Sequence, residues 1–392
     1  MHPAHNRPCT GMKILLFHYD VLDEFGGVEA VVCNLAKSLR ARGHTVDILE
    51  MGREPAKPRE LFPGITLRRL LAMQLPRWKS PRSWLSFART FMQLQRALKA
   101  FDPDVVHVHF PARQAPLMAV AALLPRHWRL VATLHNSDIW GRPADYEAIR
   151  PWRNRFFQRT DQVTAVCKAL LAAAEEDYPC ITGKGRVIYN GISDAWLQQD
   201  SNLAPQNKGG NRYILYAGRL SDVKGVDILL TAWAQIHEKY PDTQLMIIGD
   251  GPQREALQKQ ARESGLTQAV QFLPATGKQA LAEWYRHAEC LILPSSREGQ
   301  GLVLVEASLC HTICIGSNVV GINEVLKHGE NGFLFPYGDH AALAGYIGQV
   351  LDMEETQRQH LEAAAYHNVR ERFMEPHMID EYVRLYEDVC TR

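Results

Sequence analysis

The sequence predicts an α/β protein with two doubly wound domains, each built on a mainly parallel sheet. Short aliphatic segments alternate with amphipathic helical segments along nearly the whole chain, as they do in successive βαβ units. Most of the predicted strands are apolar along their full length, which strands buried on both faces of a sheet require. The chain has 392 residues, too many for one ordinary hydrophobic core, so two domains of roughly 200 residues each are expected.

The individual elements follow from the same pattern. The first predicted helix has apolar residues at helical spacing and ends at Gly43, because glycine is favoured at helix C-termini. The strands predicted in the first half are residues 12–18, 45–50, 104–110, 129–135, 162–167 and 186–191. Those predicted in the second half are residues 213–219, 243–252, 269–274 and 289–294, with helices at 226–240, 253–265 and 278–288 between them.

A polar segment separates the two halves. Residues 197–212 contain Gly and Pro and have no periodicity, which indicates a linker. We therefore expect one domain at residues 12–200 and a second at residues 211–374.

Composition restricts the class of protein. Apolar residues make up 46% of the chain and charged residues 22%, as in a globular protein. The eight cysteines are scattered without a CxxC pair, which favours reduced thiols in a cytoplasmic protein over disulfides or a metal site. No apolar stretch approaches ~18 residues and no signal peptide is visible, so we expect no membrane-spanning helix.

The net charge of +1 conceals an asymmetry between the two halves. Residues 1–200 carry 27 Lys and Arg against 19 Asp and Glu, whereas residues 201–392 carry 17 against 24. The halves are therefore expected to meet different partners.

Two loops that follow predicted strands have residues suited to an anion. Gly26 and Gly27 open the first helix, where glycines permit close approach of the backbone; alone, such a pair is more often a simple turn. Arg219 and Lys224 flank a turn in the second half and could bind phosphate oxygens, although two solvated surface cations would look the same. Their place after a strand favours the phosphate interpretation, since ligands of such sheets lie beyond the carboxyl ends of the strands.

The segment REGQGLVLVE, residues 297–306, combines glycines with two acids. Gly299 and Gly301 precede a predicted helix, whose first N–H groups could hold a diphosphate. Glu298 and Glu306 could accept hydrogen bonds from hydroxyl groups on either side of it. His135 ends a strand of the first half; a lone histidine there is more often structural than catalytic.

With Arg219, Lys224, Glu298 and Glu306 in this order, the sequence resembles the retaining GT-B glycosyltransferases of family GT4. The resemblance covers nearly the whole chain, from the segment that starts at Gly26 to GENGFLFPYGD, residues 329–339. It implies two Rossmann-like domains with a cleft between them, and a last helix at 375–392 that returns to the first domain. The first domain would bind the acceptor and the second the nucleotide sugar.

The resemblance also implies roles for individual residues. Arg219 and Lys224 would bind the diphosphate, and Glu306 would hold the ribose. Glu298 would contact the hydroxyls of the donor sugar, and His135 would lie near the reacting carbon. Further donor contacts would come from Gly26, Gly27, Thr276, Gly299, Gly301, Leu302 and Val303.

Four positions depart from the family pattern. Gln300 stands where the family often has an aromatic residue, and Cys167 stands at a common Ser position. His311 and Thr312 replace a usual Gly and Pro. None of these changes removes a charged group of the proposed site, so they concern the identity of sugar and acceptor more than activity.

The activity that the resemblance implies is transfer of a hexose, from UDP-glucose or a related UDP-hexose, with retention of configuration. The acceptor would be a glycan or a lipid-linked glycan in polysaccharide or exopolysaccharide biosynthesis. No metal-binding motif is visible, so Arg219, Lys224 and a helix N-terminus would stabilise the leaving diphosphate without a metal or other cofactor. Two alternatives stay open: a non-catalytic nucleotide-sugar-binding protein, and an epimerase or phosphorylase with the same two-domain plan.

Two basic segments with interleaved aromatic residues raise the question of a membrane surface. Residues 61–101 contain eight cations and no acid, and residues 149–159 repeat the pattern. Such segments suit an anionic lipid surface, and equally a helix whose aromatic residues pack on the core. We therefore expect a cytoplasmic protein, with possible peripheral association at the inner face of the membrane. No recognised nucleic-acid-binding module is present, so no nucleic-acid partner is expected.

Overall fold

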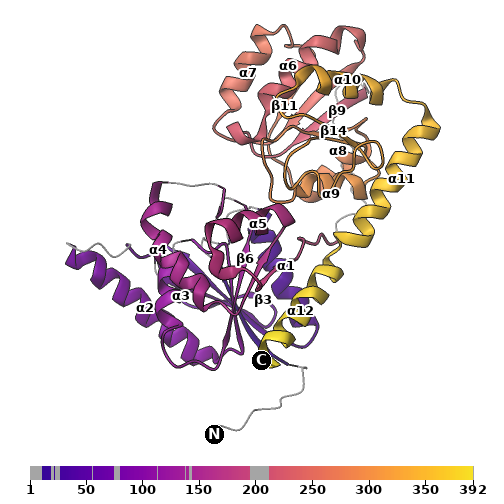
Figure 1. Cartoon of the computed structure of the whole chain (residues 1–392). Helices are drawn as coiled ribbons and strands as arrows, with labels where there is room; N and C mark the ends of the chain where they lie inside the picture. Colours follow the sequence, from indigo (N-terminus) through magenta and orange to yellow (C-terminus); the bar gives the residue numbers. More distant parts are fainter. Residues whose placement is uncertain are drawn as a thin grey trace. The chain divides into compact units, whose positions relative to one another are not determined.

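The computed structural model describes two compact units of the chain (Figure 1). Unit 1 comprises Met1–Ile188 with Met378–Arg392, and unit 2 comprises Tyr189–His377. The described residues are 11–18, 22, 27–54, 56–74, 80–112, 114–136, 138–140, 144–194 and 212–391. Gly26 lies outside these described ranges. The predicted linker at 197–212 also lies outside them, except for Arg212.

Unit 1 is built on an eight-stranded sheet in the order β3-β4-β2-β1-β5-β6-β7-β8. All pairs are parallel except β3 with β4. The strands are β1 (Lys13–His18), β2 (Thr45–Gly52), β3 (Arg59–Phe62), β4 (Ile65–Leu71), β5 (Val105–His109), β6 (Arg129–Leu134), β7 (Gln162–Ala165) and β8 (Gly185–Val187). The helices are α1 (Gly27–Ala41), α2 (Pro81–Phe101), α3 (Ala115–Ala121), α4 (Ala144–Arg159), α5 (Lys168–Asp177) and the 3₁₀ turn η1 (Pro179–Ile181).

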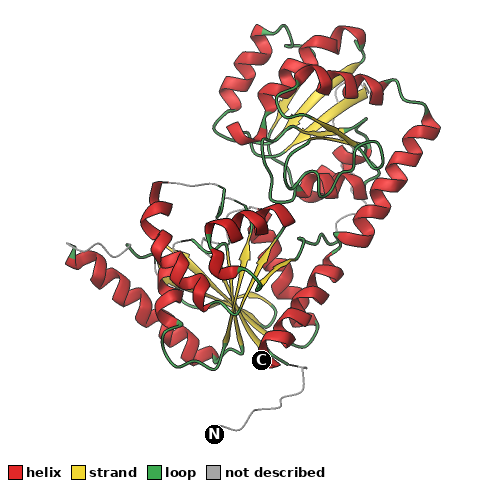
Figure 2. Cartoon of the chain, in the orientation of Figure 1, coloured by secondary structure: helices red, strands yellow, loops and turns green. Residues whose placement is uncertain are grey.

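Unit 2 is built on a six-stranded parallel sheet in the order β11-β10-β9-β12-β13-β14. The strands are β9 (Arg212–Ala217), β10 (Thr243–Ile248), β11 (Val270–Leu273), β12 (Leu291–Leu293), β13 (Cys314–Ser317) and β14 (Phe333–Phe335). The helices are η3 (Asp222–Lys224), α6 (Val226–Ile236), η4 (His237–Lys239), α7 (Arg254–Glu263), α8 (Lys278–Arg286), α9 (Leu302–Leu309), α10 (His340–Leu351) and α11 (Glu355–Arg372). Figure 2 shows helices on both sides of each sheet, so the predicted α/β class with two parallel sheets is confirmed.

The last helix, α12 (Glu375–Thr391), packs against the sheet of unit 1. The Tyr386 hydroxyl lies 2.7 Å from His107 Nδ1 on β5, and the Tyr382 hydroxyl lies 3.1 Å from Thr133 Oγ1 on β6. Both tyrosines are fully buried. The expectation that the C-terminal helix returns to the first domain is therefore confirmed.

Cys167 shows how a departure from the family pattern is accommodated. It is the N-cap of α5, and its sulfur accepts a hydrogen bond from the Leu170 backbone N–H at 3.4 Å. Serine would perform the same capping role through its hydroxyl oxygen. The Cys167 thiol therefore still caps the N-terminus of α5.

The sequence pattern did not indicate β3 and β4; β4 lies within the basic segment at 61–101, and β3 begins just before it. Arg68 and Arg69 on β4 form ion pairs with Asp47 and Glu50 on the neighbouring strand β2. These ion pairs neutralise the charges of Arg68 and Arg69 within the sheet, so the two side chains do not add to a basic surface. The cause is a pairing between distant segments, which local periodicity does not report.

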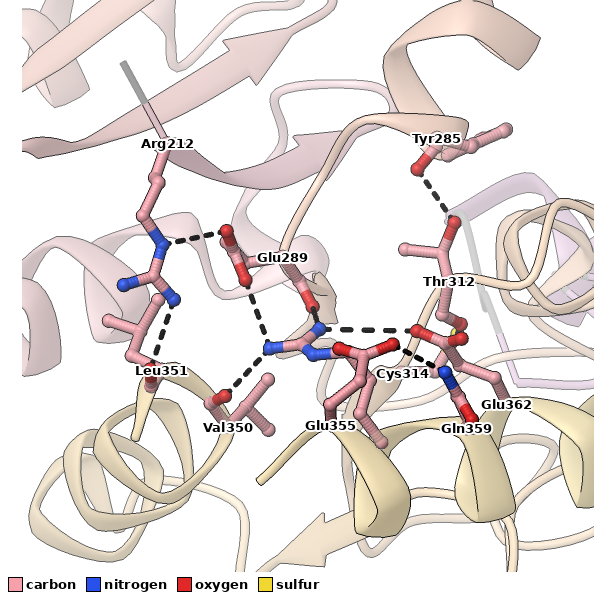
Figure 3. A network of polar contacts seen from close by, with 11 residues as sticks. Arg212, Tyr285, Glu289, Thr312, Cys314, Val350, Leu351, Glu355, Gln359 and Glu362 are labelled. Carbon is pink, nitrogen blue, oxygen red and sulfur yellow. Dashed lines mark hydrogen bonds and ion pairs between the residues drawn. The ribbon is translucent and has the colours of Figure 1, made fainter. Parts of the chain in front are cut away.

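A polar network fastens α11 to the sheet of unit 2 (Figure 3). The Arg358 guanidinium donates to the Glu289 carboxylate and carbonyl at 2.9 and 3.0 Å, and to the Val350 carbonyl at 2.9 Å. Arg212 approaches the same carboxylate from the other side, at 2.8 Å. Since only 15% of the Arg358 side chain is exposed, these bonds are largely shielded from water.

We expect Arg358→Met to destabilise unit 2 by about 2–4 kcal/mol, because it removes the side-chain donor of the Glu289 carbonyl and weakens the pairing of the Glu289 carboxylate; the Val350 carbonyl keeps the Met353 backbone N–H. Urea unfolding followed by circular dichroism measures the change. Lys259→Met is the control: it removes the cation of an exposed i,i+4 ion pair and should cost less than about 0.5 kcal/mol. Equal midpoints for the two variants would show that the network contributes nothing beyond a surface pair.

Candidate functional site

The loops after β9 and β12 lie side by side at the carboxyl edge of the unit 2 sheet. The two strands are hydrogen-bonded neighbours, with Leu291 opposite Leu215. The Ser296 backbone N–H donates to the Val223 carbonyl at 2.9 Å, which joins the two loops directly. Such an edge is where doubly wound sheets bind their ligands.

Lys224 and Glu298, which are 74 positions apart in the chain, meet in these loops. The Lys224 ammonium lies 2.6 Å from Glu298 Oε1, and the Ser295 hydroxyl donates to the same oxygen at 2.7 Å. Glu298 is buried, whereas a quarter of the Lys224 side chain is exposed. The pair therefore holds a carboxylate inside the loop and keeps part of the ammonium available to a ligand.

Two glycines make this arrangement possible. Gly225 has φ +63°, and a Cβ there would lie 2.1 Å from the Pro294 carbonyl oxygen. Gly321 has φ +83°, and a Cβ there would lie 2.2 Å from the Glu298 carbonyl oxygen. Only glycine permits both the left-handed backbone and such close packing of neighbouring chain segments.

We expect Gly321→Ala to lower activity and to destabilise unit 2 by about 1–3 kcal/mol or more, since the added methyl displaces the backbone that carries Glu298. Gly338→Ala is a matched control, because Gly338 also has a left-handed backbone (φ +87°) but no heavy atom within 4 Å of the added Cβ. Melting temperatures and initial rates measure both variants. A Gly321→Ala variant that loses no more than Gly338→Ala would contradict the importance of the contact.

The N-terminus of α9 begins directly after this loop. Gly301 is its N-cap, with φ +67° and ψ +56°, and Leu302 and Val303 form its first turn. The opening N–H groups of a helix have no acceptor within it and favour a negatively charged ligand. Gly299, Gly301, Leu302 and Val303 therefore lie together, next to Glu298.

Gln300 explains the absence of an aromatic residue in this loop. Its side-chain oxygen accepts from the Asn190 backbone N–H at 2.6 Å, and its side-chain nitrogen donates to the Asn190 carbonyl at 2.8 Å. Gln300 is buried. The amide therefore ties the loop to the segment with which unit 2 begins, a pairing that the sequence pattern did not indicate.

Glu306 lies in the second turn of α9 and is also buried. The Tyr285 hydroxyl donates to its Oε2 at 3.1 Å, and the Lys278 ammonium lies 3.6 Å from its Oε1. Burial raises the pKa of the Glu306 carboxyl, and the nearby Lys278 charge opposes this. Its acceptor groups are therefore partly engaged by Tyr285 and Lys278 in the structure described here.

Arg219 lies in the same loop after β9 as Lys224, and Thr276 lies in another loop of this edge. Arg219 follows β9, its carbonyl accepts a hydrogen bond from the Tyr216 hydroxyl at 2.9 Å, and its side chain is exposed. Thr276 is exposed in the loop after β11, which lies two strands away from β9. The exposed Arg219 side chain is free of ion pairs with any described residue, so it can turn to a bound anion.

His135 and Gly27 belong to unit 1. Gly27 is the first residue of α1. His135 follows β6 and is buried, with its Nε2 3.2 Å from His109 Nδ1. Burial lowers the pKa of His135 to about 3, with a further contribution from His18, so the ring is neutral at pH 7.

The Asp138 carboxylate fixes the backbone at His135. It accepts the backbone N–H of His135 at 3.0 and 3.1 Å and that of Asn136 at 2.8 Å. This turn holds the imidazole in place at the carboxyl edge of the sheet.

Within the described ranges, no group of three or more His, Cys, Asp or Glu residues is arranged to hold a metal ion. None of the helices in these ranges is long and apolar enough to cross a membrane.

The sequence matches two families of known proteins, one for each half. Residues 25–196 match the family described as Glycosyltransferase Family 4, and residues 198–367 match Glycosyl transferases group 1. The chain is 30% identical over 371 residues to phosphatidyl-myo-inositol mannosyltransferase of Mycobacterium leprae, covering 93% of this chain and 94% of that protein. It is 27% identical to N-acetyl-alpha-D-glucosaminyl L-malate synthase of Bacillus anthracis, with the same coverage.

Solved structures share the fold. Sucrose-phosphate synthase from Thermosynechococcus elongatus superimposes with a TM-score of 0.78 at 21% identity, covering 96% of this chain and 98% of that one. Anabaena HepE, solved in complex with UDP and glucose, superimposes with a TM-score of 0.76 at 20% identity, covering 96% and 100%.

Proposed function

This chain belongs to glycosyltransferase family 4 and has the GT-B fold, and from that premise we propose that it transfers a hexose from UDP-glucose or a related UDP-hexose. The acceptor is a hydroxyl group of a glycan or a lipid-linked glycan in polysaccharide biosynthesis, such as that of an exopolysaccharide. Transfer retains the configuration of the anomeric carbon.

The observation that carries this proposal is the pairing of Lys224 with Glu298 at 2.6 Å, directly before the N-terminus of α9. A nucleotide sugar has two negative phosphates next to a ring of hydroxyl groups. The ammonium and the helix N–H groups suit the phosphates, and the Glu298 carboxylate suits the hydroxyls. Arg219, exposed in the same loop after β9 as Lys224, adds a second cation.

In this mechanism the protein stabilises charge as the glycosidic bond breaks. Negative charge accumulates on the leaving diphosphate, where Lys224, Arg219 and the first N–H groups of α9 lie ready to bind it. These groups supply the positive charge that a divalent ion supplies in other enzymes, so the reaction needs no metal and no cofactor. EDTA is expected to leave the rate unchanged.

Relatives support the class of donor and acceptor. HepE was solved with UDP and glucose, and one relative is named for a mannosyl transfer to phosphatidyl-myo-inositol. These names support a nucleotide-activated hexose and a hydroxyl-bearing acceptor for this chain.

The test is a thermal-shift screen of UDP-, GDP- and ADP-sugars, followed by an assay of nucleotide release with and without EDTA. We expect stabilisation by a UDP-hexose, UDP release in the presence of acceptor, and an α-linked product from an α-linked donor by NMR. Binding without any release would favour a non-catalytic binding protein. Phosphate-dependent release of a sugar phosphate would favour a phosphorylase.

We also propose that unit 1 associates with an anionic membrane surface through α2, as a peripheral protein at the cytoplasmic face. The exposed side of α2 alternates cations with apolar side chains: Arg82, Leu85, Arg89, Met92, Arg96 and Lys99. Leu85 is 73% exposed and Met92 52%, and the helix contains no acid. A helix lying flat on anionic lipid presents this combination.

In the second basic-aromatic segment, at 149–159 on α4, two of the three aromatic residues and one arginine are buried. Phe156 and Phe157 are fully buried, and Arg153 is buried with its guanidinium donating to the Asp138 carbonyl. Of the two interpretations left open for this segment, packing of the aromatic residues on the core applies to Phe156 and Phe157, because the helical period directs them inward, while Arg150, Arg155 and Arg159 are exposed. Only α2 carries the membrane proposal.

We expect the double variant Arg89→Glu/Arg96→Glu to bind liposomes of phosphatidylglycerol and phosphatidylcholine at least about tenfold more weakly at low salt, since each cation contributes about 1 kcal/mol. Co-sedimentation measures the change. Lys259→Glu/Arg262→Glu on α7 changes the net charge by the same amount and should leave binding intact. Failure of the unmodified protein to co-sediment would exclude α2 as a membrane contact.

A further inference from the structure

The carboxylate of Glu306 has a different partner on each of its two oxygens. The Tyr285 hydroxyl donates to Oε2 at 3.1 Å, and the Lys278 ammonium lies 3.6 Å from Oε1. Both partners belong to α8, whereas Glu306 belongs to α9, and these two helices contact each other. The neighbouring helix therefore sets the orientation of the carboxylate.

The two oxygens differ in their access to a ligand. Tyr285 is fully buried, so Oε2 faces the interior of unit 2. Half of the Lys278 side chain is exposed and 11% of the Glu306 side chain is exposed, so the carboxylate reaches the surface on the Oε1 side. At 3.6 Å the ammonium attracts Oε1 but is too distant for a strong hydrogen bond. The lone pairs of Oε1 therefore remain available to hydroxyl groups of a ligand.

Thr312 fixes the backbone of Tyr285. Its hydroxyl donates to the Tyr285 carbonyl at 2.7 Å, and Thr312 is buried (Figure 3). Thr312 stands where the family usually has proline, which has no hydroxyl to donate. This departure from the family pattern therefore supplies a bond that anchors the residue holding Glu306.

Lys278 occupies a position that its own helix does not favour. It is the first residue of α8, whose first turn contains no acid. The N-terminus of a helix favours negative over positive charge, so α8 itself does not stabilise the ammonium. The acidic partner comes from α9 in the form of Glu306.

The charge of Glu306 depends on the same two partners. Burial raises the pKa of the Glu306 carboxyl, while the Lys278 charge and the Tyr285 hydrogen bond act against this rise. The pKa of the Tyr285 hydroxyl lies well above its ordinary value, and burial raises the pKa of the Cys310 and Cys314 thiols to about 12. These three groups stay protonated in neutral and acid solution, so among them and Glu306 only the carboxyl changes its charge there.

We propose that Tyr285 and Lys278 are positioning residues for Glu306, which they hold so that its accessible oxygen accepts hydrogen bonds from the ribose of a nucleotide sugar. The Tyr285 hydroxyl fixes Oε2 on the buried side, and the Lys278 ammonium draws Oε1 toward the surface. The two ribose hydroxyls then donate to an oxygen that is held in place and has two lone pairs. The ribose is that of the nucleotide sugar, so this assignment rests on the proposed function.

Tyr285→Phe tests the first contact, because it removes the hydroxyl alone. Calorimetry on the full-length chain compares UDP with its 2′,3′-dideoxy analogue, which lacks both ribose hydroxyls and keeps the base and the diphosphate. Tyr285→Phe should reduce the preference for UDP by about threefold to tenfold, and it should raise KM for UDP-glucose more than it lowers kcat. Tyr213→Phe is the matched control and should keep the full preference, since it removes another buried hydroxyl of unit 2, one that donates to the Trp284 carbonyl at 2.8 Å.

The pH dependence separates positioning from a general loss of stability. The preference for UDP is present above the pKa of Glu306 and falls as the pH drops through it, because the ionised carboxylate is the stronger acceptor. Loss of the Tyr285 hydrogen bond or of the Lys278 charge raises this pKa further, so the preference should fall at a higher pH than in the unmodified protein. Lys278→Met should show this shift, and Lys278→Arg should reverse it. Titration of the diphosphate cancels in the ratio of the two affinities.

Two results would overturn the positioning role. One is an unmodified protein that binds UDP and the dideoxy analogue equally well. The other is a Tyr285→Phe variant with the preference and the pH dependence of the unmodified protein. If circular dichroism shows that Tyr285→Phe does not fold, Lys278→Met decides by the same ratio, because it alters a half-exposed side chain. Binding of neither nucleotide contradicts the proposed function itself, and the positioning role is then excluded with it.

Discussion

Lys224→Ala should abolish measurable turnover while leaving the fold intact. Removing one preorganised group that stabilises a developing negative charge typically lowers the rate by about 10²–10³-fold. Lys224 is suited to this role because its ammonium is partly exposed at the loop, 2.6 Å from Glu298 and directly before α6. Initial rates of UDP release at saturating donor measure the loss.

The control for this variant is Lys259→Ala, which removes an exposed lysine of the same unit. It should retain the unmodified rate within about twofold, as expected for a surface ion pair of little energetic weight. Activity of Lys224→Ala close to that of this control would refute the assignment of Lys224 to the leaving diphosphate.

Glu298→Gln should reduce kcat/KM for the nucleotide sugar by about 10–100-fold and change the affinity for UDP alone very little. Glutamine keeps the shape and can still accept a hydrogen bond from Ser295, but it loses the charge that strengthens hydrogen bonds to sugar hydroxyls and to Lys224. A tenfold loss corresponds to about 1.4 kcal/mol of transition-state stabilisation. UDP lacks the sugar, so its binding separates this effect from a disturbed phosphate site.

Glu330→Gln is the matched control, since Glu330 is 70% exposed and pairs with Lys327 on the same unit. A second comparison uses the double variant Lys224→Ala/Glu298→Gln. It should be more stable than Lys224→Ala, because no buried carboxylate is left without its cation, and yet remain inactive. A double variant that regains turnover would show that the pair serves stability alone.

The alternation of strands and helices was predictable from local pattern for much of the chain, but β3, β4, β13 and β14 were not among the predicted strands. Arg219 and Lys224 follow β9, and the Glu298–Gly301 segment follows β12, as strand–loop–helix alternation indicated. Several predicted strands extend past the observed ends, and the largest differences are residues 186–191 against β8 (Gly185–Val187) and residues 243–252 against β10 (Thr243–Ile248). Beyond Ile248 the backbone turns through Gly249, whose φ of +149° only glycine readily adopts.

The cations of residues 61–101 show where local pattern failed. Arg68 and Arg69 look like neighbours of Arg82 and Arg89 in the sequence, but they lie on β4 and pair with acids of β2. Arg89 is exposed on α2. The sequence gives the sign of each charge. The pairing of strands decides whether that charged side chain forms an ion pair with an acid or is exposed to water.

The sequence by itself determined which chemical groups this protein has and at which strand ends they lie, because periodicity and turn residues act over a few positions of the chain. Only the tertiary structure decided which groups meet. It joined Lys224 to Glu298, placed Gly321 against the Glu298 carbonyl, bound Gln300 to Asn190, and set His18 beside His109. Three of these contacts join residues that are 74 or more positions apart in the chain. Gly321 is nearer to Glu298 in the sequence, but a Cβ there would lie 2.2 Å from the Glu298 carbonyl oxygen, which excludes any side chain. They depend on sheet register and close packing, which no local signal in the chain encodes.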